Sequence, residues 1–190
     1  MDDQTLRSLL AFMQKAENLK NILRSAYTSQ GRRESSAEHS WRLALLVLIL
    51  SEFFTGTDSH KLLKLAVVHD LGEAISGDIP ATEQSAVDGK SASELEAMRS
   101  LCACLPEDIR NELLDLWNEY EAGQTPEARI IKGLDKLETI MQHNQGQNPP
   151  DFNYAFNLHY GKQYMAYDSL LEQIRAVLDV DTNRRLREKG

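Results

Sequence analysis

The segment Leu62-Leu63-Lys64-Leu65-Ala66-Val67-Val68-His69-Asp70 sets the architecture of this chain. It is an apolar run that ends in a histidine and an aspartate. Such a run is expected to be buried, and an unpaired carboxylate is costly to bury, so these two residues need partners or a cation. Two more side chains that can bind metals, His39 and Asp135, lie in other segments. The order His39, His69-Asp70, Asp135 therefore predicts a divalent-metal site built from three segments.

The neighbours of the two outlying residues support this prediction. His39 shares a helical face with Leu43, and Asp135 shares one with Ile131 and Leu134. Taken singly, each polar residue has an ordinary explanation as a surface residue, a cap or a hydrogen-bonded core residue. Several polar side chains that lean toward one core are more simply explained by a shared cation. The other histidines lack such neighbours and are expected to be structural or surface residues: His60, His143 and His159.

Hydrophobic periodicity indicates helices nearly everywhere, and no segment alternates convincingly with a period of two. Ser35 and Glu38 have the spacing of a capping box, which places a helix start directly before His39. The sequence between Thr82 and Ser91 is polar and is expected to form a mobile surface loop. Helices are predicted over residues of about 4–26, 35–54, 59–71, 92–104, 106–123, 125–142 and 163–179. We therefore expect an all-α fold, a helical bundle that forms one domain over residues 1–190.

The composition of the chain excludes several classes of partner and location. The chain has 190 residues, 42% of them hydrophobic and 26% charged, and a net charge of −8 with a pI near 5.1. A nucleic-acid polymer or a membrane surface would require a basic face, so neither is expected as a partner. The longest apolar run, Leu43–Leu50, is too short to cross a bilayer about 30 Å thick. No secretory signal is recognised, and two cysteines, Cys102 and Cys104, are too few for a disulfide framework. These features favour a reducing cytoplasm.

The chemistry of the four candidate ligands limits which metal ions the site could bind. Two imidazoles and two carboxylates form a mixed nitrogen and oxygen set, unlike the thiolate-rich sites of structural zinc. Such sets suit Mn, Fe, Co, Ni, Zn or Mg, commonly with positions left open for water. One divalent ion is expected, and its identity stays open. The ion could polarise a phosphate oxygen and lower the pKa of water, which is what hydrolysis requires.

The combination of Glu38-His39-Ser40, His69-Asp70 and Asp135 resembles the HD-domain superfamily of metal-dependent phosphohydrolases. The resemblance covers residues of about 30–140, which would form the metal-binding core, with C-terminal helices following over 151–180. It implies a helical bundle of the HD type and a hydrolase that acts on phosphate esters.

The residues after Asp70 indicate the branch. Two-metal members of the superfamily have a further histidine shortly after the pair, and this chain has none there, so a single metal is expected. The Gly-Tyr-Pro extension of the cyclic-dinucleotide phosphodiesterases is also absent. The sequence from His69 to Pro80 is similar to that of the small HD-domain 5′-deoxynucleotidases. That resemblance implies that Glu73 and Asp78 are catalytic carboxylates, that Arg24 binds the substrate phosphate, and that the protein forms a homodimer.

Elementary chemistry is compatible with these roles. In a helical continuation Glu73 lies four residues after His69 and on its face, and Arg24 offers the planar donor that suits phosphate. Asp78 could assist the nucleophilic water or protonate the leaving 5′-oxygen. Ser25 stands where the deoxynucleotidases of bacteria are expected to have a tryptophan, which leaves the preference between deoxyribose and ribose open.

The sequence therefore predicts a 5′-nucleotidase that acts on (deoxy)ribonucleoside 5′-monophosphates. Two alternatives stay open. The chain could hydrolyse another phosphorylated small molecule, since one fold can host varied pockets. It could also be a non-catalytic helical regulatory module in which the metal is a structural clip.

Overall fold

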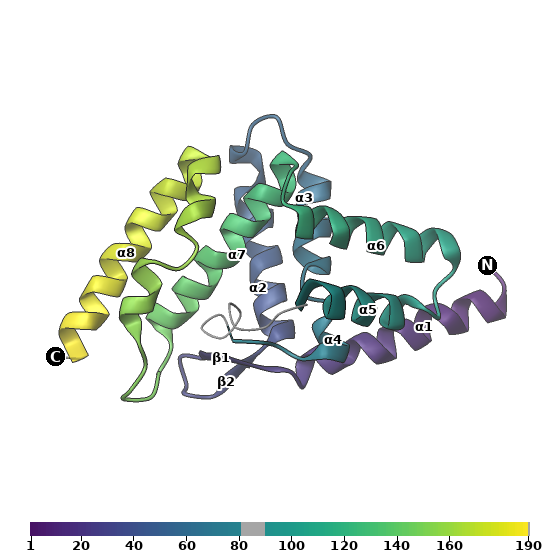
Figure 1. The fold of residues 1–190 in the computed structure, drawn as a ribbon, viewed down its shortest axis with the longest axis horizontal. Helices are drawn as coiled ribbons and strands as arrows, with labels where there is room; N and C mark the ends of the chain where they lie inside the picture. Colours follow the sequence, from purple (N-terminus) through teal and green to yellow (C-terminus); the bar gives the residue numbers. More distant parts are fainter. Residues whose placement is uncertain (81–89, 190) are drawn as a thin grey trace.

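Helices make up nearly all the regular structure of this protein (Figure 1). The computed structural model describes residues 1–80 and 90–189. Its α-helices are α1 (Asp3–Ala16), α2 (Ser36–Leu50), α3 (Ser59–Val68), α4 (Glu73–Ser76), α5 (Lys90–Cys102), α6 (Glu107–Ala122), α7 (Pro126–Gln145) and α8 (Ser169–Lys189). Short 3₁₀ helices are η1 (Glu17–Lys20), η2 (Ser51–Phe53), η4 (Tyr154–Leu158) and η5 (Lys162–Tyr167), and the strands are β1 (Leu23–Tyr27) and β2 (Arg33–Ser35). The predicted all-α fold class is confirmed.

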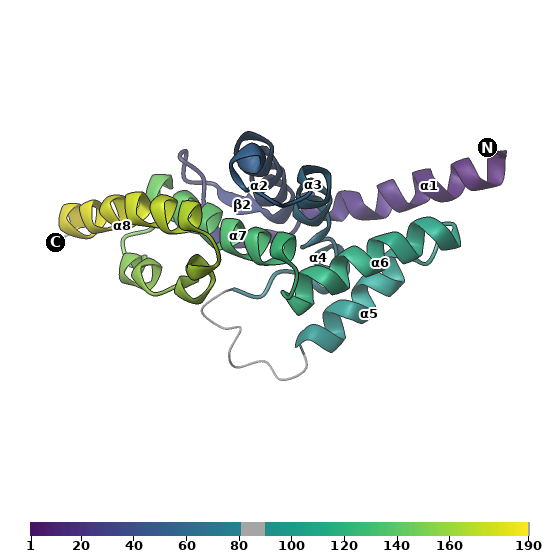
Figure 2. The same cartoon turned by 90° about the horizontal axis from the view of Figure 1, so that it is seen from above.

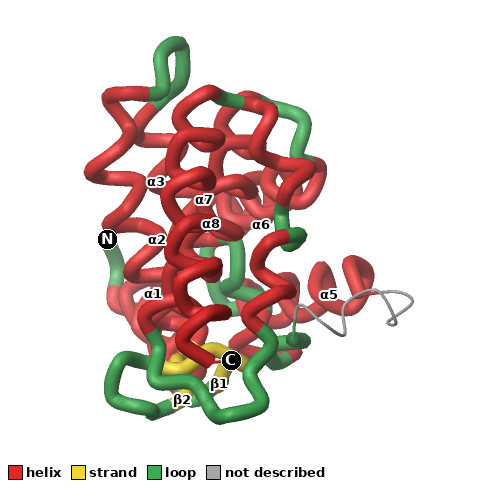
Figure 3. Tube along the Cα trace, turned by 90° about the vertical axis from the view of Figure 1, so that its left-hand side faces the viewer, coloured by secondary structure: helices red, strands yellow, loops and turns green. Residues whose placement is uncertain are grey.

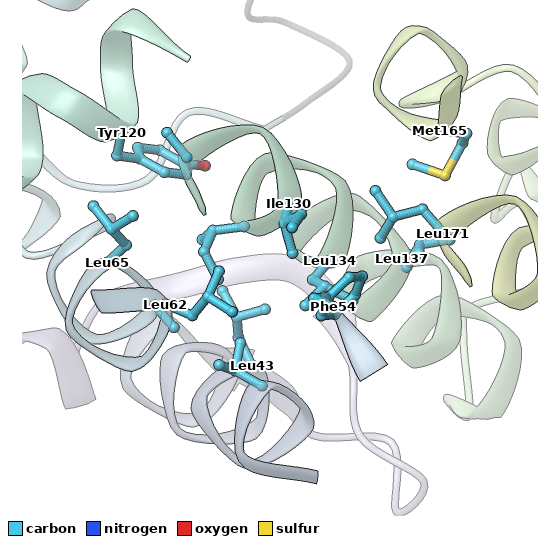
Figure 4. Packing of buried hydrophobic residues seen from close by; sticks show 14 of the residues in the cluster. Leu43, Phe54, Leu62, Leu65, Tyr120, Ile130, Leu134, Leu137, Met165 and Leu171 are labelled. Carbon is cyan, nitrogen blue, oxygen red and sulfur yellow. The ribbon is translucent and has the colours of Figure 1, made fainter. Parts of the chain in front are cut away.

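Helix α7 is the centre of the fold. It packs against α2, α3, α6 and α8, and most of its residues are buried. The main core lies where these helices meet, and Figure 4 shows the side chains that fill it. Leu43 of α2, Leu62 and Leu65 of α3, and Leu134 and Leu137 of α7 are all almost completely buried. Each such side chain contributes about 1.5–3 kcal/mol of burial free energy, which holds α2, α3 and α7 in fixed relative positions.

Caps set where the site-bearing helices begin. The Ser35 side chain accepts from Glu38 N, and the Glu38 carboxylate accepts from Ser35 N at 2.8 Å. This is the predicted capping box, and it starts α2 at Ser36, three residues before His39. Thr125 caps α7 through Ala128 N. These local interactions determine which residues of each helix face inward.

The prediction of one helix over residues 4–26 is wrong beyond Ala16. The chain passes through η1 and then forms β1, which pairs antiparallel with β2, with Leu23 opposite Ser35 and Tyr27 opposite Arg33. Figure 3 shows this small hairpin at one end of the upright helices. The Arg33 guanidinium donates to the carbonyls of Leu23 and Arg24 and holds the two strands together. These contacts lie about ten residues apart, so a local helical periodicity does not reveal them.

Other predicted boundaries shift by a few residues. The helix predicted over 35–54 ends at Leu50 and continues as η2, and the one predicted over 59–71 ends at Val68. The last helix is predicted over 163–179, but η5 occupies its first part and α8 runs from Ser169 to Lys189. Asp168 is extended, with φ −154°, and its carboxylate accepts from Leu170 N, which restarts the chain as a new helix. The predicted loop from Thr82 to Ser91 lies mostly outside the described residues.

The ends of the chain lie far apart. Helix α1 projects at one end of the molecule beside α5 and α6, whereas α8 lies at the opposite end (Figure 2). Helix α7 lies between them and contacts both the α2–α3 pair and α8. None of the described helices combines the length and the apolar character that a membrane crossing requires. Cys102 and Cys104 are both free thiols.

Candidate metal centre

The four predicted metal ligands converge. His39 Nε2 lies 3.2 Å from Asp135 Oδ1 and 3.7 Å from Asp70 Oδ2. His69 Nε2 lies 3.0 Å from the same Asp70 oxygen, and the two histidine Nε2 atoms are 3.4 Å apart. His39 comes from α2, His69 and Asp70 directly follow α3, and Asp135 comes from α7. The core leucines fix the relative positions of α2, α3 and α7, and the four side chains therefore lie close together.

The hydrogen bonds of the two imidazoles leave their Nε2 atoms free to bind a cation. His39 Nδ1 contacts Glu138 Oε2, and His69 Nδ1 lies 2.9 Å from the carbonyl oxygen of Ala66. Because an acceptor faces each Nδ1, the proton of each neutral ring sits there and the lone pair sits on Nε2. Without a proton or a cation between them, two such lone pairs and two carboxylates would repel one another at these distances. Among the residues that the structure describes, none donates a hydrogen bond to the buried Asp70 Oδ2. The donor set therefore fits a divalent metal ion.

Titration of the ligands agrees with a cation at this point. Burial lowers the pKa of His39, but Glu138 and Asp135 outweigh burial and raise this pKa to about 10. Burial raises the pKa of Asp70, but the neighbouring His69 and His39 lower it by more. The pKa of Asp70 therefore lies well below its usual range. In the ion-free protein a proton on His39 thus offsets the carboxylates, and a metal ion would take the place of that proton.

Asp135 is held so that a single oxygen faces the ligand cluster. Its Oδ2 accepts from the hydroxyl of Tyr120 at 2.9 Å and from Lys136 Nζ at 2.7 Å. Its Oδ1 is the oxygen beside His39. Burial lowers the pKa of Lys136, but Asp135 raises it more, so that Lys136 stays charged. These contacts leave Oδ1 as the oxygen of Asp135 that faces the cluster.

Arg24, the predicted phosphate-binding residue, lies beside the ligands. It extends from β1, its Nη2 donates to the hydroxyl of Thr139 at 3.1 Å, and its Nη1 lies 3.6 Å from Asp70 Oδ2. Its Nε lies 3.4 Å from Glu34 Oε2. Burial lowers the pKa of Arg24, and the carboxylates of Asp70 and Asp78 raise it by more, so its charge is permanent. The hairpin that the sequence did not predict is the element that places this guanidinium.

Glu73 and Asp78, the predicted catalytic carboxylates, face the same cavity. Glu73 begins α4 and is buried, whereas Asp78 follows Gly77, whose φ of +79° turns the chain back at the end of α4. Burial, with Asp70 and Asp78 close by, raises the pKa of Glu73 to about 9. Glu73 is therefore protonated at neutral pH in the ion-free protein.

These residues line a cavity of about 350 Å³, the volume range of small-molecule sites. Every predicted site residue except the deeper His39 lies on its wall. The wall also includes Lys132 and Lys136, from the helix that carries Asp135. It is completed by residues that the sequence did not single out for this role, among them Tyr120, Tyr160, Gly161, Gln163 and Tyr164. The lining combines charged groups with the aromatic rings of Trp117, Tyr120, Tyr160 and Tyr164, which suits a charged ligand with a flat organic part.

Sequence reasoning missed two contributors. Glu138, the partner of His39 Nδ1, lies three residues after Asp135 and is completely buried. That helical spacing is a signal that could have revealed it. His143 was expected to be structural or at the surface; it is buried, contacts Asn157 Oδ1 through Nδ1 at 2.8 Å and also lines the cavity. Burial lowers its pKa to about 4, so it stays neutral.

Known proteins are similar to this chain in sequence. The model of the HD domain family matches residues 16–175. The human protein named 5′-deoxynucleotidase HDDC2 is 36% identical over 141 residues, which cover 73% of this chain and 68% of that protein. The Schizosaccharomyces pombe 5′-deoxynucleotidase hdd1 is 34% identical over 71% of this chain and 70% of its own length.

Solved structures with a similar fold include proteins from bacteria and archaea. A predicted metal-dependent phosphohydrolase from Magnetospirillum magnetotacticum superimposes with a TM-score of 0.80 and 26% identity, over 96% of this chain and 95% of its own. A conserved protein from Pyrococcus furiosus matches with a TM-score of 0.61 and 29% identity, over 87% and 99% of the two chains. The resemblance read from the sequence is confirmed: this chain belongs to the HD-domain family.

Proposed function

We propose that this protein is a metal-dependent phosphohydrolase that removes phosphate from (deoxy)ribonucleoside 5′-monophosphates. The observation that carries the proposal is the convergence of two imidazole Nε2 atoms and two carboxylates beside a fixed guanidinium, in one cavity. Relatives named 5′-deoxynucleotidase, from human to yeast, support the same substrate class.

The metal would be held by His39, His69, Asp70 and Asp135. We propose one divalent ion, drawn from Mn, Co, Ni, Fe, Zn and Mg on the basis of the mixed nitrogen and oxygen donors. When bound there, such an ion supplies Lewis acidity for a phosphate oxygen and lowers the pKa of water. The side chains around the ion would bind the phosphate and transfer the protons.

Arg24 would bind the phosphate. Its guanidinium is charged at every relevant pH. Contacts with Thr139 and Glu34 hold it in place, so its position is preorganised before the substrate binds. A planar fork of donors matches two phosphate oxygens at once and offsets their negative charge. Because Arg24 Nη1 lies 3.6 Å from Asp70 Oδ2, a phosphate bound by the guanidinium would lie next to the ligand cluster.

Glu73 and Asp78 would move the protons. In the ion-free protein burial raises the pKa of Glu73 to about 9, which favours a proton on this carboxyl at neutral pH. We propose that Glu73 donates this proton to the leaving 5′-oxygen. Asp78, on the cavity wall after Gly77, would accept a proton from the attacking water. Two carboxyl groups with different surroundings can thus take the opposite roles that ester hydrolysis requires.

A nucleotide panel tests the proposal. The purified protein, stripped of metal and reloaded with each candidate ion, is assayed for phosphate release from 5′-monophosphates, diphosphates, cyclic nucleotides and sugar phosphates. We expect 5′-monophosphates to be cleaved fastest, and only with a metal. Faster cleavage of another phosphate ester would favour the alternative of a different small-molecule substrate.

The alternative of a non-catalytic metal clip is tested by Asp70→Ala. We expect this variant to lose turnover while far-UV circular dichroism shows its helices retained, because the core leucines lie apart from the cavity. Loss of the helical signal in Asp70→Ala, with no phosphate release by the wild type, would favour the clip.

We also propose that two copies pair through the outer face of α2. Trp41, Leu48 and Ile49 on this face are 65%, 64% and 61% exposed, and every residue of α2 from Leu43 to Leu50 is apolar. Between Leu43 and Ser51 the helix has no charged residue. A two-fold axis sets the same patch against itself, and an uncharged face avoids the repulsion that this would otherwise cause in a chain with a net charge of −8. A second copy is therefore the occupant that this face favours.

The free thiols of Cys102 and Cys104 support a reducing compartment, and we propose the cytoplasm. We propose no nucleic-acid or membrane partner for this acidic chain.

A further inference from the structure

We infer that Glu138 is a positioning residue for the metal centre, that it acts through His39, and that Arg42 holds it in place. The inference rests on the proposed metal-dependent function, and it assigns a role to two residues that do not touch the cavity.

Both oxygens of the Glu138 carboxylate are engaged. Glu138 lies one turn after Asp135 on α7 and has no exposed surface. Its Oε2 accepts from His39 Nδ1, and its Oε1 accepts from Arg42 Nε at 2.5 Å. Arg42 Nη2 also donates to the Glu138 carbonyl at 3.4 Å. His39 and Arg42 are three residues apart on α2, so two side chains of this helix both contact the Glu138 carboxylate of α7.

Stability alone does not account for this arrangement. Removing an ion pair from water is costly, and apolar residues of similar volume often stabilise a core as well or better. The leucines around the pair already join α2 to α7. A completely buried carboxylate that meets a candidate metal ligand is therefore better explained by what it does to that ligand.

Two effects on His39 follow from the geometry. The acceptor at Nδ1 keeps the ring proton on that atom, so the lone pair is on Nε2, which faces Asp135 and His69. A negative charge behind the ring also makes Nε2 a stronger donor to a cation. Arg42 prevents the carboxylate from rotating away, because it holds the second oxygen. Glu138 thus bears on metal affinity without being a ligand.

The test is Co²⁺ binding to the metal-stripped full chain, measured by calorimetry and by the visible absorption of bound Co²⁺. Glu138→Gln keeps the size of the side chain but removes its charge. We expect this variant to bind Co²⁺ about 10–100-fold more weakly, the usual cost of losing such a partner, with a changed absorption spectrum.

Glu127→Gln is the matched control. Glu127 is also a buried carboxylate of α7; it accepts from Asp58 N at 3.1 Å and pairs with Lys61 at 3.6 Å, at the end of the helix away from the ligands. The same chemical change there should lower thermal stability and leave Co²⁺ affinity at the wild-type value. Arg42→Gln supplies a second variant, should Glu138→Gln fail to fold, and it should weaken Co²⁺ binding by a smaller factor.

The outcomes separate the two proposals. Wild-type Co²⁺ affinity in folded Glu138→Gln would overturn the role of Glu138 and leave the phosphohydrolase proposal intact. Wild-type affinity in Arg42→Gln would overturn the part assigned to Arg42. A wild-type protein that binds neither Co²⁺ nor any other divalent ion would instead defeat the proposed function itself.

Discussion

The Nε2 atoms of His39 and His69 lie 3.4 Å apart, and each ring points its other nitrogen at an acceptor. The two rings pack edge to face, with centroids 5.4 Å apart. Neither ring can turn to relieve the contact without breaking the hydrogen bond at its Nδ1. The pair is thus arranged in advance for a cation between the two nitrogens.

Metal affinity should rise with pH. The pKa of His39 is raised above its usual 6.5 to about 10 in the ion-free protein, so the ring is charged below that pH and the metal must displace its proton. Affinity should therefore increase about tenfold per pH unit between pH 7 and pH 9, as one proton is released. Calorimetry in buffers of different ionisation enthalpy counts that proton. An affinity that does not change with pH would contradict the assignment of His39 as a ligand.

Arg24→Lys should retain the fold and lose most of the activity. Lysine keeps the charge but cannot donate to Thr139, Asp70 and a phosphate from one planar group. The loss of one charge-assisted hydrogen bond is worth about 1.5–3 kcal/mol, or about 10–150-fold in kcat/KM. Steady-state kinetics with a 5′-monophosphate measures it. Arg32→Lys is the control, because Arg32 is exposed and pairs with Glu38; its kinetics should match the wild type.

Gly161→Ala should displace the wall of the cavity. Gly161 has φ +71°, and a Cβ there would lie 2.6 Å from Lys136 Cβ. The backbone strain costs about 1–2 kcal/mol, and the clash pushes η5 away from α7. Gly56→Ala isolates the strain, because Gly56 has φ +79° with nothing within 4 Å of a Cβ.

Both glycine variants should lose free energy of unfolding in denaturant titrations, and Gly161→Ala should lose more. KM should rise in Gly161→Ala alone, since Tyr160 and Tyr164 on either side of it line the cavity. Equal KM values in the two variants would show that this wall does not contact the substrate.

His143 should make the protein less stable in weak acid. Burial lowers its pKa from 6.5 to about 4, so between these values the unfolded chain binds a proton that the folded chain does not. The stabilisation is complete above pH 6.5 and is lost as the pH falls toward 4, by about 2 kcal/mol between pH 7 and pH 5. Denaturant titrations of the metal-free protein at both pH values measure this loss. His143→Gln should show a smaller loss, whereas the exposed His159→Gln should behave as the wild type.

Leu48→Glu should disrupt pairing of two copies. It introduces a charge at the centre of the uncharged outer face of α2, and a two-fold axis would set that charge against its equivalent. Sedimentation equilibrium should show a dimer for the wild type and a monomer for the variant. Val177→Glu is the control, because Val177 is 64% exposed on α8, outside the α2 face. A monomeric wild type would refute the proposed pairing.

Local sequence was enough to predict the helices that carry the metal ligands. Ser35 and Thr125 cap α2 and α7 through interactions with residues three positions away, and Gly123 ends α6 with φ +59°. The apolar spacing around His39 and Asp135 was enough to predict that both would face inward. These features depend on contacts within one or two helical turns, and a pattern of that range is visible in the sequence alone.

The tertiary structure decided what depends on distant contacts. Residues 23–27 follow a helical pattern and yet form a strand, because β2 supplies hydrogen bonds that no local pattern encodes. Arg24 owes its position to that hairpin, and Glu138 owes its role to His39, 99 residues earlier in the chain. The sequence by itself thus determined which residues could bind a metal. Only the packing of α2, α3 and α7 decided that their Nε2 and carboxylate atoms meet, because that depends on how the core leucines of separate helices fit together.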